Sequence, residues 1–244
     1  MTDVTTFVLV PGFWLGGWAW DGVADRLRDR GGIVDALTLP GLEPAAAAGE
    51  ADATLDDQIA AVVDAVRRAQ GRVVLVGHSG GGAVVTGATD TVPDLVDDLV
   101  FVDSGPVADG AVASPELADD VRALDLPDWA ALEAAGSSLA GLDDDDLAEF
   151  RRRAVPHPAA AARQPIALHD ERRRDVPVTL VCSSMSAQQV RDMVDARHPW
   201  FEELGRYTSV RLVDLPTGHW PMWSRTDDLA DELLTIASTS TPAQ

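Results

Sequence analysis

The sequence predicts an α/β fold in which a mostly parallel β-sheet carries helices on both faces, together with a helical insertion. Short apolar runs alternate with amphipathic segments along most of the chain, a pattern typical of a parallel sheet. The run VVLV (Val73–Val76) is apolar throughout, as expected for a strand buried on both faces. The alternation breaks over residues 104–175, which are richer in Ala, Asp, Arg and Pro. We therefore expect a core formed by residues 1–103 and 176–244, and a helical cap formed by residues 104–175.

The first part of the chain is expected to alternate strand and helix. The apolar run FVLV ends at Pro11 and Gly12, which stop a strand. Thr54 and Asp57 form a capping pair for a later helix, and Gly71 follows the end of that helix. In order, we expect a strand at 7–10, a helix carrying Trp20, Val23 and Leu27, a strand at 33–41, the helix after Thr54, a strand at 73–76, a helix at 80–91 and a strand at 99–103.

The alternation resumes after the insertion. Within the insertion, the segment LDDDDLAEFRRRAV begins with acidic residues and ends with arginines, which matches the dipole of a solvent-exposed helix. Beyond it, VPVTLVC predicts a strand ending at Cys182, and SVRLVDL predicts another. Helices are expected near residues 187–194 and 227–238, where apolar residues recur at helical spacing.

Composition excludes several classes of function. The 244 residues include 19 basic and 40 acidic residues, for a formal net charge of -21. Such a surface repels phosphate and anionic lipid, so we expect neither a nucleic-acid nor a membrane partner. Every basic residue is arginine, which excludes chemistry that needs a lysine. The single cysteine, Cys182, excludes an internal disulfide. No His or Cys cluster has metal-ligand spacing, so we expect no metal and no cofactor.

The N-terminal stretch MTDVTTFVLVPG gives an expectation for the cellular location of the protein. It has no basic start and no long apolar region, so we expect no signal peptide and a cytoplasmic protein. The sequence leaves the oligomeric state open, with a homodimer as one alternative.

The stretch VLVGHSGGG places a single hydroxyl between glycines, directly after a buried strand. A Gly-x-Ser-x-Gly turn between a strand and a helix is a nucleophile elbow, which exposes the serine on a sharp turn. Side chains at Gly77 or Gly81 would collide with the adjoining strand and helix. The sequence therefore predicts Ser79 as a nucleophile, with the first amide of the helix directed at the group that it attacks.

Ser79 requires a base, and the chain has five histidines. His219 lies in LPTGHWPMW, on a loop just past the last expected strand. That loop lies at the carboxyl edge of the sheet, as does Ser79. We therefore expect His219 to be the base. The others are expected to be structural (His78) or exposed or capping (His157, His169, His198).

Four stretches of the chain together resemble the α/β-hydrolase superfamily: VLVPGFWLGGWAW, GHSGGG, LVFVDSG and GHWPMW. The first and last resemble the branch of small esterases that includes plant methylesterases and hydroxynitrile lyases. The resemblance implies an α/β-hydrolase fold with a catalytic order of nucleophile, acid and histidine. It assigns Ser79 as the nucleophile and His219 as the general base and acid.

Two departures from the family pattern affect the expected site. The first is the oxyanion loop, which usually opens with His-Gly and here opens with Pro11 and Gly12. The amides of Gly80 and Phe13 are still expected to form the oxyanion hole, with Trp14 as the less favoured donor.

The second departure concerns the acid. After the strand ending at Cys182, no carboxylate occurs until Asp192, which is expected inside a helix. Asp103 ends the preceding strand, where some family members carry their acid, so we predict that Asp103 orients His219. Asp192, Asp214 and a two-residue Ser–His site with Ser183 in the acid position remain alternatives.

These residues predict a serine hydrolase that cleaves a small to medium hydrophobic carboxylic ester, or a lactone, through an acyl-enzyme on Ser79. We expect Trp14, Trp220 and Met222 to line an apolar substrate pocket, because they flank the proposed catalytic positions. The alternatives are a cofactor-free perhydrolase and a non-catalytic ligand-binding protein on the same fold. Hydroxynitrile lyase activity is disfavoured, because the related plant enzymes use a lysine and this chain has none.

Overall fold

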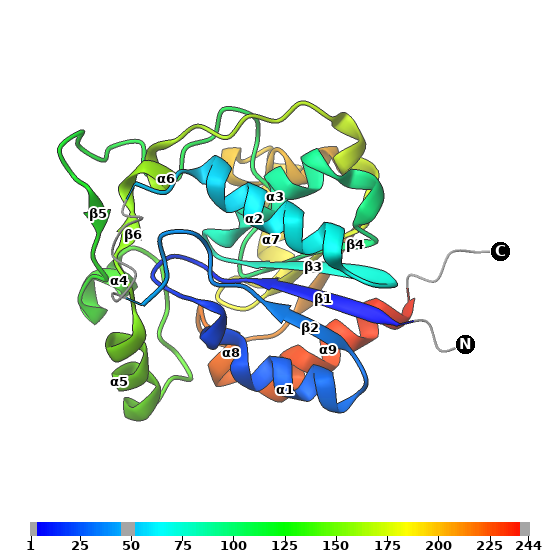
Figure 1. Ribbon diagram of the computed structural model, residues 1–244, viewed down its shortest axis with the longest axis horizontal. Helices are drawn as coiled ribbons and strands as arrows, with labels where there is room; N and C mark the ends of the chain where they lie inside the picture. Colours follow the sequence, from blue (N-terminus) through cyan, green and yellow to red (C-terminus); the bar gives the residue numbers. More distant parts are fainter. Residues whose placement is uncertain (1–3, 45–51, 240–244) are drawn as a thin grey trace.

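A computed structural model of the protein describes residues 4–44 and 52–239. Its centre is a six-stranded sheet in the order β2-β1-β3-β4-β7-β8, and every pair of neighbouring strands is parallel. The predicted parallel sheet is therefore confirmed (Figure 1). The strands are β1 (Thr5–Val10), β2 (Ile33–Ala36), β3 (Arg72–His78), β4 (Asp98–Val102), β7 (Val178–Cys182) and β8 (Val210–Asp214).

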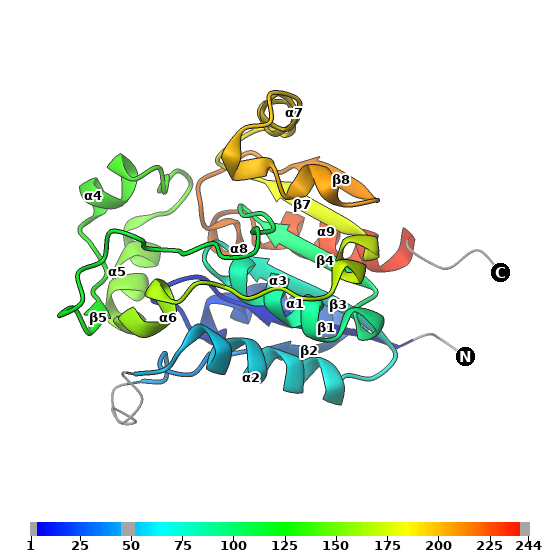
Figure 2. The ribbon, with the colours of Figure 1, turned by 90° about the horizontal axis from the view of Figure 1, so that it is seen from above.

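Helices cover both faces of the sheet (Figures 1 and 2). Alternate residues of β3 point to opposite faces, so Val73 and Leu75 join one hydrophobic core while Val74 and Val76 join the other. The first core lies under α2 (Leu55–Arg68), α3 (Gly81–Thr91) and α7 (Ala187–Asp195). The second lies under α1 (Asp21–Asp29), α8 (Pro221–Ser224) and α9 (Thr226–Thr239). The sheet is therefore buried on both sides, as its apolar strands require.

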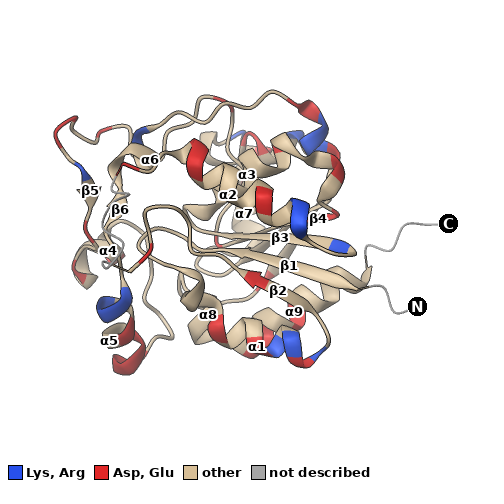
Figure 3. Cartoon of the chain, in the orientation of Figure 1, with Lys and Arg blue, Asp and Glu red and all other residues tan. Residues whose placement is uncertain are grey.

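Most local predictions hold. The Thr54 side chain accepts a hydrogen bond from the Asp57 amide, and the Asp57 carboxylate accepts one from the Thr54 amide. The expected helix after the acidic run is α5 (Asp144–Arg153), with acidic residues in its first turn and arginines in its last. β2 ends at Ala36, earlier than expected, where its pairing with β1 also ends. Figure 3 shows charged residues on the surrounding helices, whereas β1 carries none.

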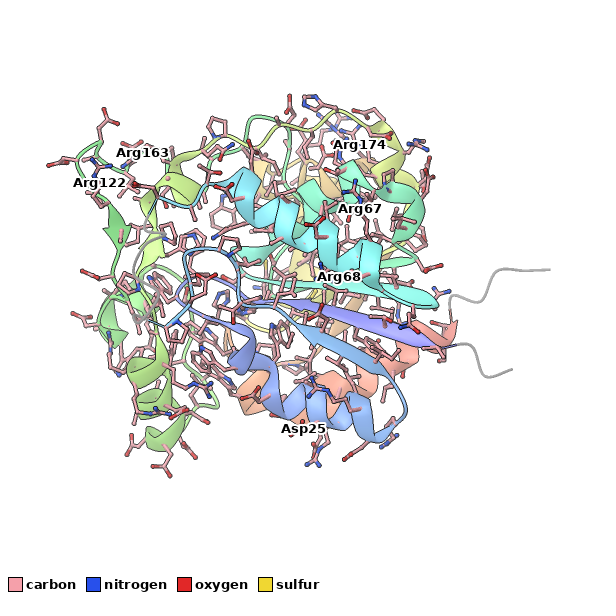
Figure 4. The ribbon with its side chains drawn as sticks, in the orientation of Figure 1. Asp25, Arg67, Arg68, Arg122, Arg163 and Arg174 are labelled. Carbon is pink, nitrogen blue, oxygen red and sulfur yellow. The ribbon has the colours of Figure 1, made fainter. Side chains whose placement is uncertain are left out.

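Most of residues 104–175 form short elements at the end of the sheet where the strands finish, whereas the last part of this segment runs to the opposite end, where β7 begins (Figures 1 and 2). They include two strands that the sequence did not predict, β5 (Ala123–Leu124) and β6 (His157–Pro158), which pair antiparallel. The Arg163 guanidinium donates hydrogen bonds to the carbonyls of Ala118 and Val121, so it ties the loop before β5 to α6 (Figure 4). The helices are α4 (Trp129–Ala134), α5, α6 (Ala159–Arg163) and the 3-10 helix η4 (Glu171–Asp175).

The remaining elements are short connections. They are the 3-10 helices η1 (Gly17–Trp20), η3 (Pro93–Leu95), η5 (Pro199–Phe201) and η6 (Leu204–Arg206). Within the described ranges, no helix combines the length and apolar character needed to cross a bilayer.

A buried ion network anchors the end of the insertion to the core. The Arg173 guanidinium lies 3.2 Å from the Asp90 carboxylate of α3 and 3.1 Å from the Glu203 carboxylate, and all three side chains are buried. Asp90 also accepts hydrogen bonds from the amides of His169 and Asp170. Figure 4 shows the neighbouring Arg174, whose guanidinium also reaches Glu203. Removing one member of such a network leaves an uncompensated buried charge.

We predict that Arg173→Met lowers the free energy of unfolding by about 3–5 kcal/mol, because Asp90 and Glu203 lose a buried partner. Urea denaturation followed by circular dichroism measures the change. The matched control is Arg172→Met, since Arg172 forms exposed ion pairs with Asp94 and Asp170 and should leave stability near that of the wild type. Equal stability of the two variants would contradict the prediction.

Candidate active site

The turn between β3 and α3 holds Ser79 in a strained conformation. Its φ is 50°, in the left-handed region that favours glycine. A Cβ atom at Gly77 would lie 2.6 Å from Val85 Cγ2, and one at Gly81 would lie 2.6 Å from the Pro11 carbonyl oxygen. The predicted collisions are therefore present, and the turn admits a serine only because both flanking positions are glycine.

Three loops at the carboxyl ends of the strands bring Ser79, His219 and Asp103 together. His219 Nε2 lies 2.8 Å from Ser79 Oγ, and His219 Nδ1 lies 2.5 Å from Asp103 Oδ2. The loops follow β3, β8 and β4 respectively. Parallel strands end at a shared edge, so residues more than a hundred positions apart meet there.

Asp103 is held by donors from the loop after β7. Its Oδ1 accepts hydrogen bonds from the amides of Ser183 and Ser184, at 3.3 and 2.9 Å. Its Oδ2 accepts one from the Ser184 hydroxyl at 2.7 Å. Burial raises the pKa of the Asp103 carboxyl, but the hydrogen bond and charge of His219 and the Ser184 donors outweigh burial and lower that pKa to about 2. Asp103 is therefore ionised at neutral pH.

The other proposed acids lie elsewhere. Asp192 is exposed on α7, where it accepts a hydrogen bond from Gln188. Asp214 accepts a hydrogen bond from the Ala187 amide, so it caps the start of α7. Ser183 contributes its amide to Asp103, and its buried hydroxyl has no hydrogen-bond partner. Among the alternatives for the acid, the structure thus places Asp103 against the imidazole.

Two contacts fix the backbone of His219. His78 Nε2 lies 2.7 Å from the His219 carbonyl oxygen, which can only accept, so Nε2 carries the proton. Burial, and next the charge of His219, lower the pKa of the His78 imidazole to about 3, so it is neutral. The His219 amide donates to the Ser138 carbonyl at 2.7 Å. Residues of both the core and the insertion therefore position His219.

Gly80 and Phe13 are the residues whose amides the sequence predicts as oxyanion donors. Both residues line a cavity beside Ser79, and a Cβ atom at Gly80 would lie 2.5 Å from the Phe13 ring. Neither amide donates a hydrogen bond to any residue that the structure describes. Trp14 does not line this cavity, and its indole N–H donates to the Leu124 carbonyl at 2.8 Å.

The cavity beside Ser79 has a volume of about 150 Å³ and is mostly apolar. Its walls come from α2, the first turns of α3, the loop after β4 and the region around α6. The lining residues are Phe13, Leu55, Gln58, Ser79, Gly80, Ala83, Val84, Ser104, Gly105, Val107, Ala111, Val112, Ala113, His157, Ala161 and Gln164.

The structure corrects the expectation that Trp14, Trp220 and Met222 line the substrate pocket, because none of them lines this cavity. Trp220 and Met222 are 2% and 1% exposed and belong to the core beneath α8 and α9. Trp220 packs against Phe150, with ring centroids 5.3 Å apart, and against the His219 ring at 4.9 Å. These side chains bury more apolar area in the core than they would beside a small cavity.

Sequence reasoning also missed two residues of the site. His157 was expected to be exposed or capping, and this was wrong: it is 2% exposed and lines the cavity. Nothing in its local stretch VPHPA indicates burial, because its position depends on the path of the insertion. Ser184 was not singled out, although the pair Ser183–Ser184 directly follows a strand and was a signal for hydrogen-bond donors. No group of three or more His, Cys, Asp or Glu residues within the described ranges is placed to hold a metal ion.

Comparisons with known proteins place this geometry in context. Residues 7–232 match the model of the "Alpha/beta hydrolase family". A carbendazim-hydrolyzing esterase of Nocardioides sp. (strain SG-4G) is 28% identical over 254 residues, covering 96% of this chain and 100% of that protein. Tomato methylketone synthase I complexed with 2-tridecanone superposes with a TM-score of 0.73 at 19% identity, over 98% of this chain and 99% of that one. A pyrethroid hydrolase from Sphingobium faniae JZ-2 gives 0.68 at 21% identity, over 97% and 98%. Both structural likenesses concern the fold.

We predict that Ser184→Ala raises the pKa of Asp103 from about 2 toward its ordinary value, because Oδ2 loses the hydroxyl donor. A carboxyl group whose pKa is lower in the folded state than in the unfolded state stabilises the protein at pH values above its unfolded pKa. This stabilisation is lost as the pH falls through the folded pKa. The variant should therefore lose the stabilisation from Asp103 at a higher pH than the wild type. Titration of the Asp103 carboxyl carbon by NMR measures the shift.

The matched control is Ser183→Ala. The Ser183 hydroxyl has no hydrogen-bond partner, and alanine keeps the amide that donates to Asp103. The pKa of Asp103 should stay near that of the wild type. An equal shift in both variants, or no shift in Ser184→Ala, would exclude the hydroxyl as its cause.

Proposed function

The chain belongs to the alpha/beta hydrolase family, and from this premise we propose that it is a serine-dependent carboxylic ester hydrolase. It cleaves a small to medium hydrophobic ester, or a lactone, through an acyl-enzyme on Ser79. The observation that carries the proposal is the continuous hydrogen-bonded chain from Ser79 Oγ through His219 to Asp103, beside a largely apolar cavity. A serine of ordinary acidity becomes nucleophilic when a base is in contact with its hydroxyl.

The charge on Asp103 determines the tautomer of His219. An ionised carboxylate accepts hydrogen bonds, so the proton of neutral His219 lies on Nδ1. Nε2 then presents its lone pair to Ser79 Oγ. This is the tautomer that a general base needs, and loss of it is costly to catalysis.

The proposed cycle uses these three residues in turn. His219 Nε2 takes the Ser79 proton as Oγ attacks the ester carbonyl carbon, and the carbonyl oxygen becomes an oxyanion. The amides of Gly80 and Phe13 stabilise that oxyanion, each contributing about 3–4 kcal/mol to the transition state. His219 returns the proton to the leaving alcohol, and the C–O bond breaks to leave the acyl-enzyme. Water, deprotonated by His219, then releases the acid and restores Ser79.

Residues 104–175 act in this proposal as a cap over a core formed by residues 1–103 and 176–244. Support comes from the cavity walls, because Val107, Ala111 and Ala161 of that segment line the same cavity as Ala83 and Val84 of α3. The cap thereby excludes water from the acyl group and limits its size. Neutral, apolar walls favour a hydrophobic ester over a charged one.

We predict that Ser79→Ala abolishes ester turnover while leaving the fold intact, because the nucleophile is removed without a change in the core. A panel of p-nitrophenyl esters measures turnover, and a fluorophosphonate probe with mass spectrometry measures labelling. Ser209→Ala, at an exposed serine before β8, is the control and should retain both. Retained turnover in Ser79→Ala would exclude Ser79 as the nucleophile. Labelling of the wild type at Ser79 without turnover of any ester would favour a ligand-binding protein.

We predict that Asp103→Asn lowers kcat by about 10⁴-fold, because an amide no longer enforces the Nδ1–H tautomer of His219. Steady-state kinetics on one activated ester measures the change. Asp192→Asn serves as the control, since Asp192 is exposed on α7 and does not contact His219. A large loss in Asp192→Asn with a small one in Asp103→Asn would show that another carboxylate supports the base.

A further inference from the structure

The cavity beside Ser79 contains few polar side chains, and several of them are already bonded to the protein. The Gln58 amide donates to the Pro40 carbonyl, and the Gln164 amide oxygen accepts from the Asp56 amide. The Ser104 hydroxyl donates to the Ser79 carbonyl at 2.6 Å. These bonds hold the walls in place and use one polar atom of each side chain.

His157 differs from its neighbours in the cavity. It is 2% exposed, its buried Nδ1 has no hydrogen-bond partner, and no described residue forms a hydrogen bond with its ring. Its ring stacks on Phe13, with centroids 3.7 Å apart and planes inclined by 18°. The pairing of β5 with β6 and the start of α6 fix the backbone on either side. A buried polar ring at the wall of a cavity, with no hydrogen-bond partner among the described residues, requires an explanation, since buried polar groups are normally satisfied.

The chemistry of the ring limits what it can bind. Burial lowers the pKa of the His157 imidazole to about 3, so the ring is neutral at neutral pH. A neutral imidazole has one donor nitrogen and one acceptor nitrogen, so it pairs with a hydroxyl, an amide or a carbonyl. It offers no charge to a carboxylate or phosphate, and this fits the neutral walls around it.

The size of the cavity limits the ligand further. A cavity of about 150 Å³ holds a group the size of benzene. We propose that His157 is a substrate-binding residue, which selects a benzene-sized portion of the substrate that carries a neutral hydrogen-bonding group. The assignment of that portion to an ester rests on the proposed function, whereas the binding site itself does not.

The test uses two probes of similar size, phenol and toluene, and protein carrying Ser79→Ala, so that neither turnover nor the serine hydroxyl contributes. Adding His157→Phe keeps an aromatic ring against Phe13 and removes the ring nitrogens that would form a hydrogen bond with phenol. We expect this change to weaken phenol binding about tenfold and to leave toluene binding unchanged. Isothermal titration calorimetry measures both dissociation constants. Equal weakening of the two probes, or no weakening of phenol, overturns the proposal.

A second measurement needs no substitution at position 157. In the Ser79→Ala protein labelled with nitrogen-15 histidine, phenol should shift a ring-nitrogen resonance of His157, and toluene should not. The proposal fails if phenol leaves both nitrogens unshifted. This measurement decides the question even where His157→Phe does not fold.

Turnover gives the third readout and separates this inference from the proposed function. Phenyl acetate carries its ring in the alcohol portion, and methyl phenylacetate carries it in the acyl portion. For each ester, kcat/KM is compared with that of an analogue that has a hydroxyl group on the ring. His157→Phe should lower kcat/KM about tenfold for the hydroxy esters of one series alone. Selective phenol binding without hydrolysis of any ester would support the site and contradict the esterase. Equal loss for hydroxy and plain esters would contradict the role of His157.

Discussion

The hydrogen bond between His219 and Asp103 is the interaction on which the site depends. The register of the sheet prepares it, because His78 of β3 lies opposite Val102 of β4, so Ser79 and Asp103 are the next residues on adjacent strands. Both leave their strands with positive φ, of 50° and 45°. Two neighbouring strands thus direct a hydroxyl and a carboxylate to the same edge, and one imidazole bridges them. The strain in these two residues is offset by the packing of the buried strands behind them.

The strand order of the sheet explains why the acid can follow β4. The strand order β4-β7-β8 places β7 between the strands that lead to Asp103 and His219. An acid at the end of either β4 or β7 can therefore reach the same imidazole nitrogen. Here β4 provides the carboxylate, and the loop after β7 provides the amides and hydroxyl that hold it. The buried carboxylate and its hydrogen-bond donors therefore come from different strands, and the donors stabilise the charged form of the carboxylate beside His219.

Features set by local chemistry could be predicted from the sequence. The strands follow from apolar runs, the start of α2 from Thr54 and Asp57, and the elbow from glycines on both sides of Ser79. Features set by the path of the chain could not. Trp220 follows His219 directly, yet its side chain turns into the core against Phe150. His157 reaches the cavity only because β5 and β6 pair, and both strands are two residues long. So short a pairing leaves no periodic pattern to recognise.

The insertion is part of the site and not an addition to a finished site. It contributes His157 and several apolar residues to the cavity, and its Ser138 and Ala140 carbonyls accept hydrogen bonds from the amides of His219 and Gly218. The loop carrying His219 is therefore fixed from the insertion as well as from His78 of the core. A change in the insertion that alters the ligand cavity also reaches the imidazole through these backbone bonds. One segment therefore both lines the cavity and holds the backbone of His219.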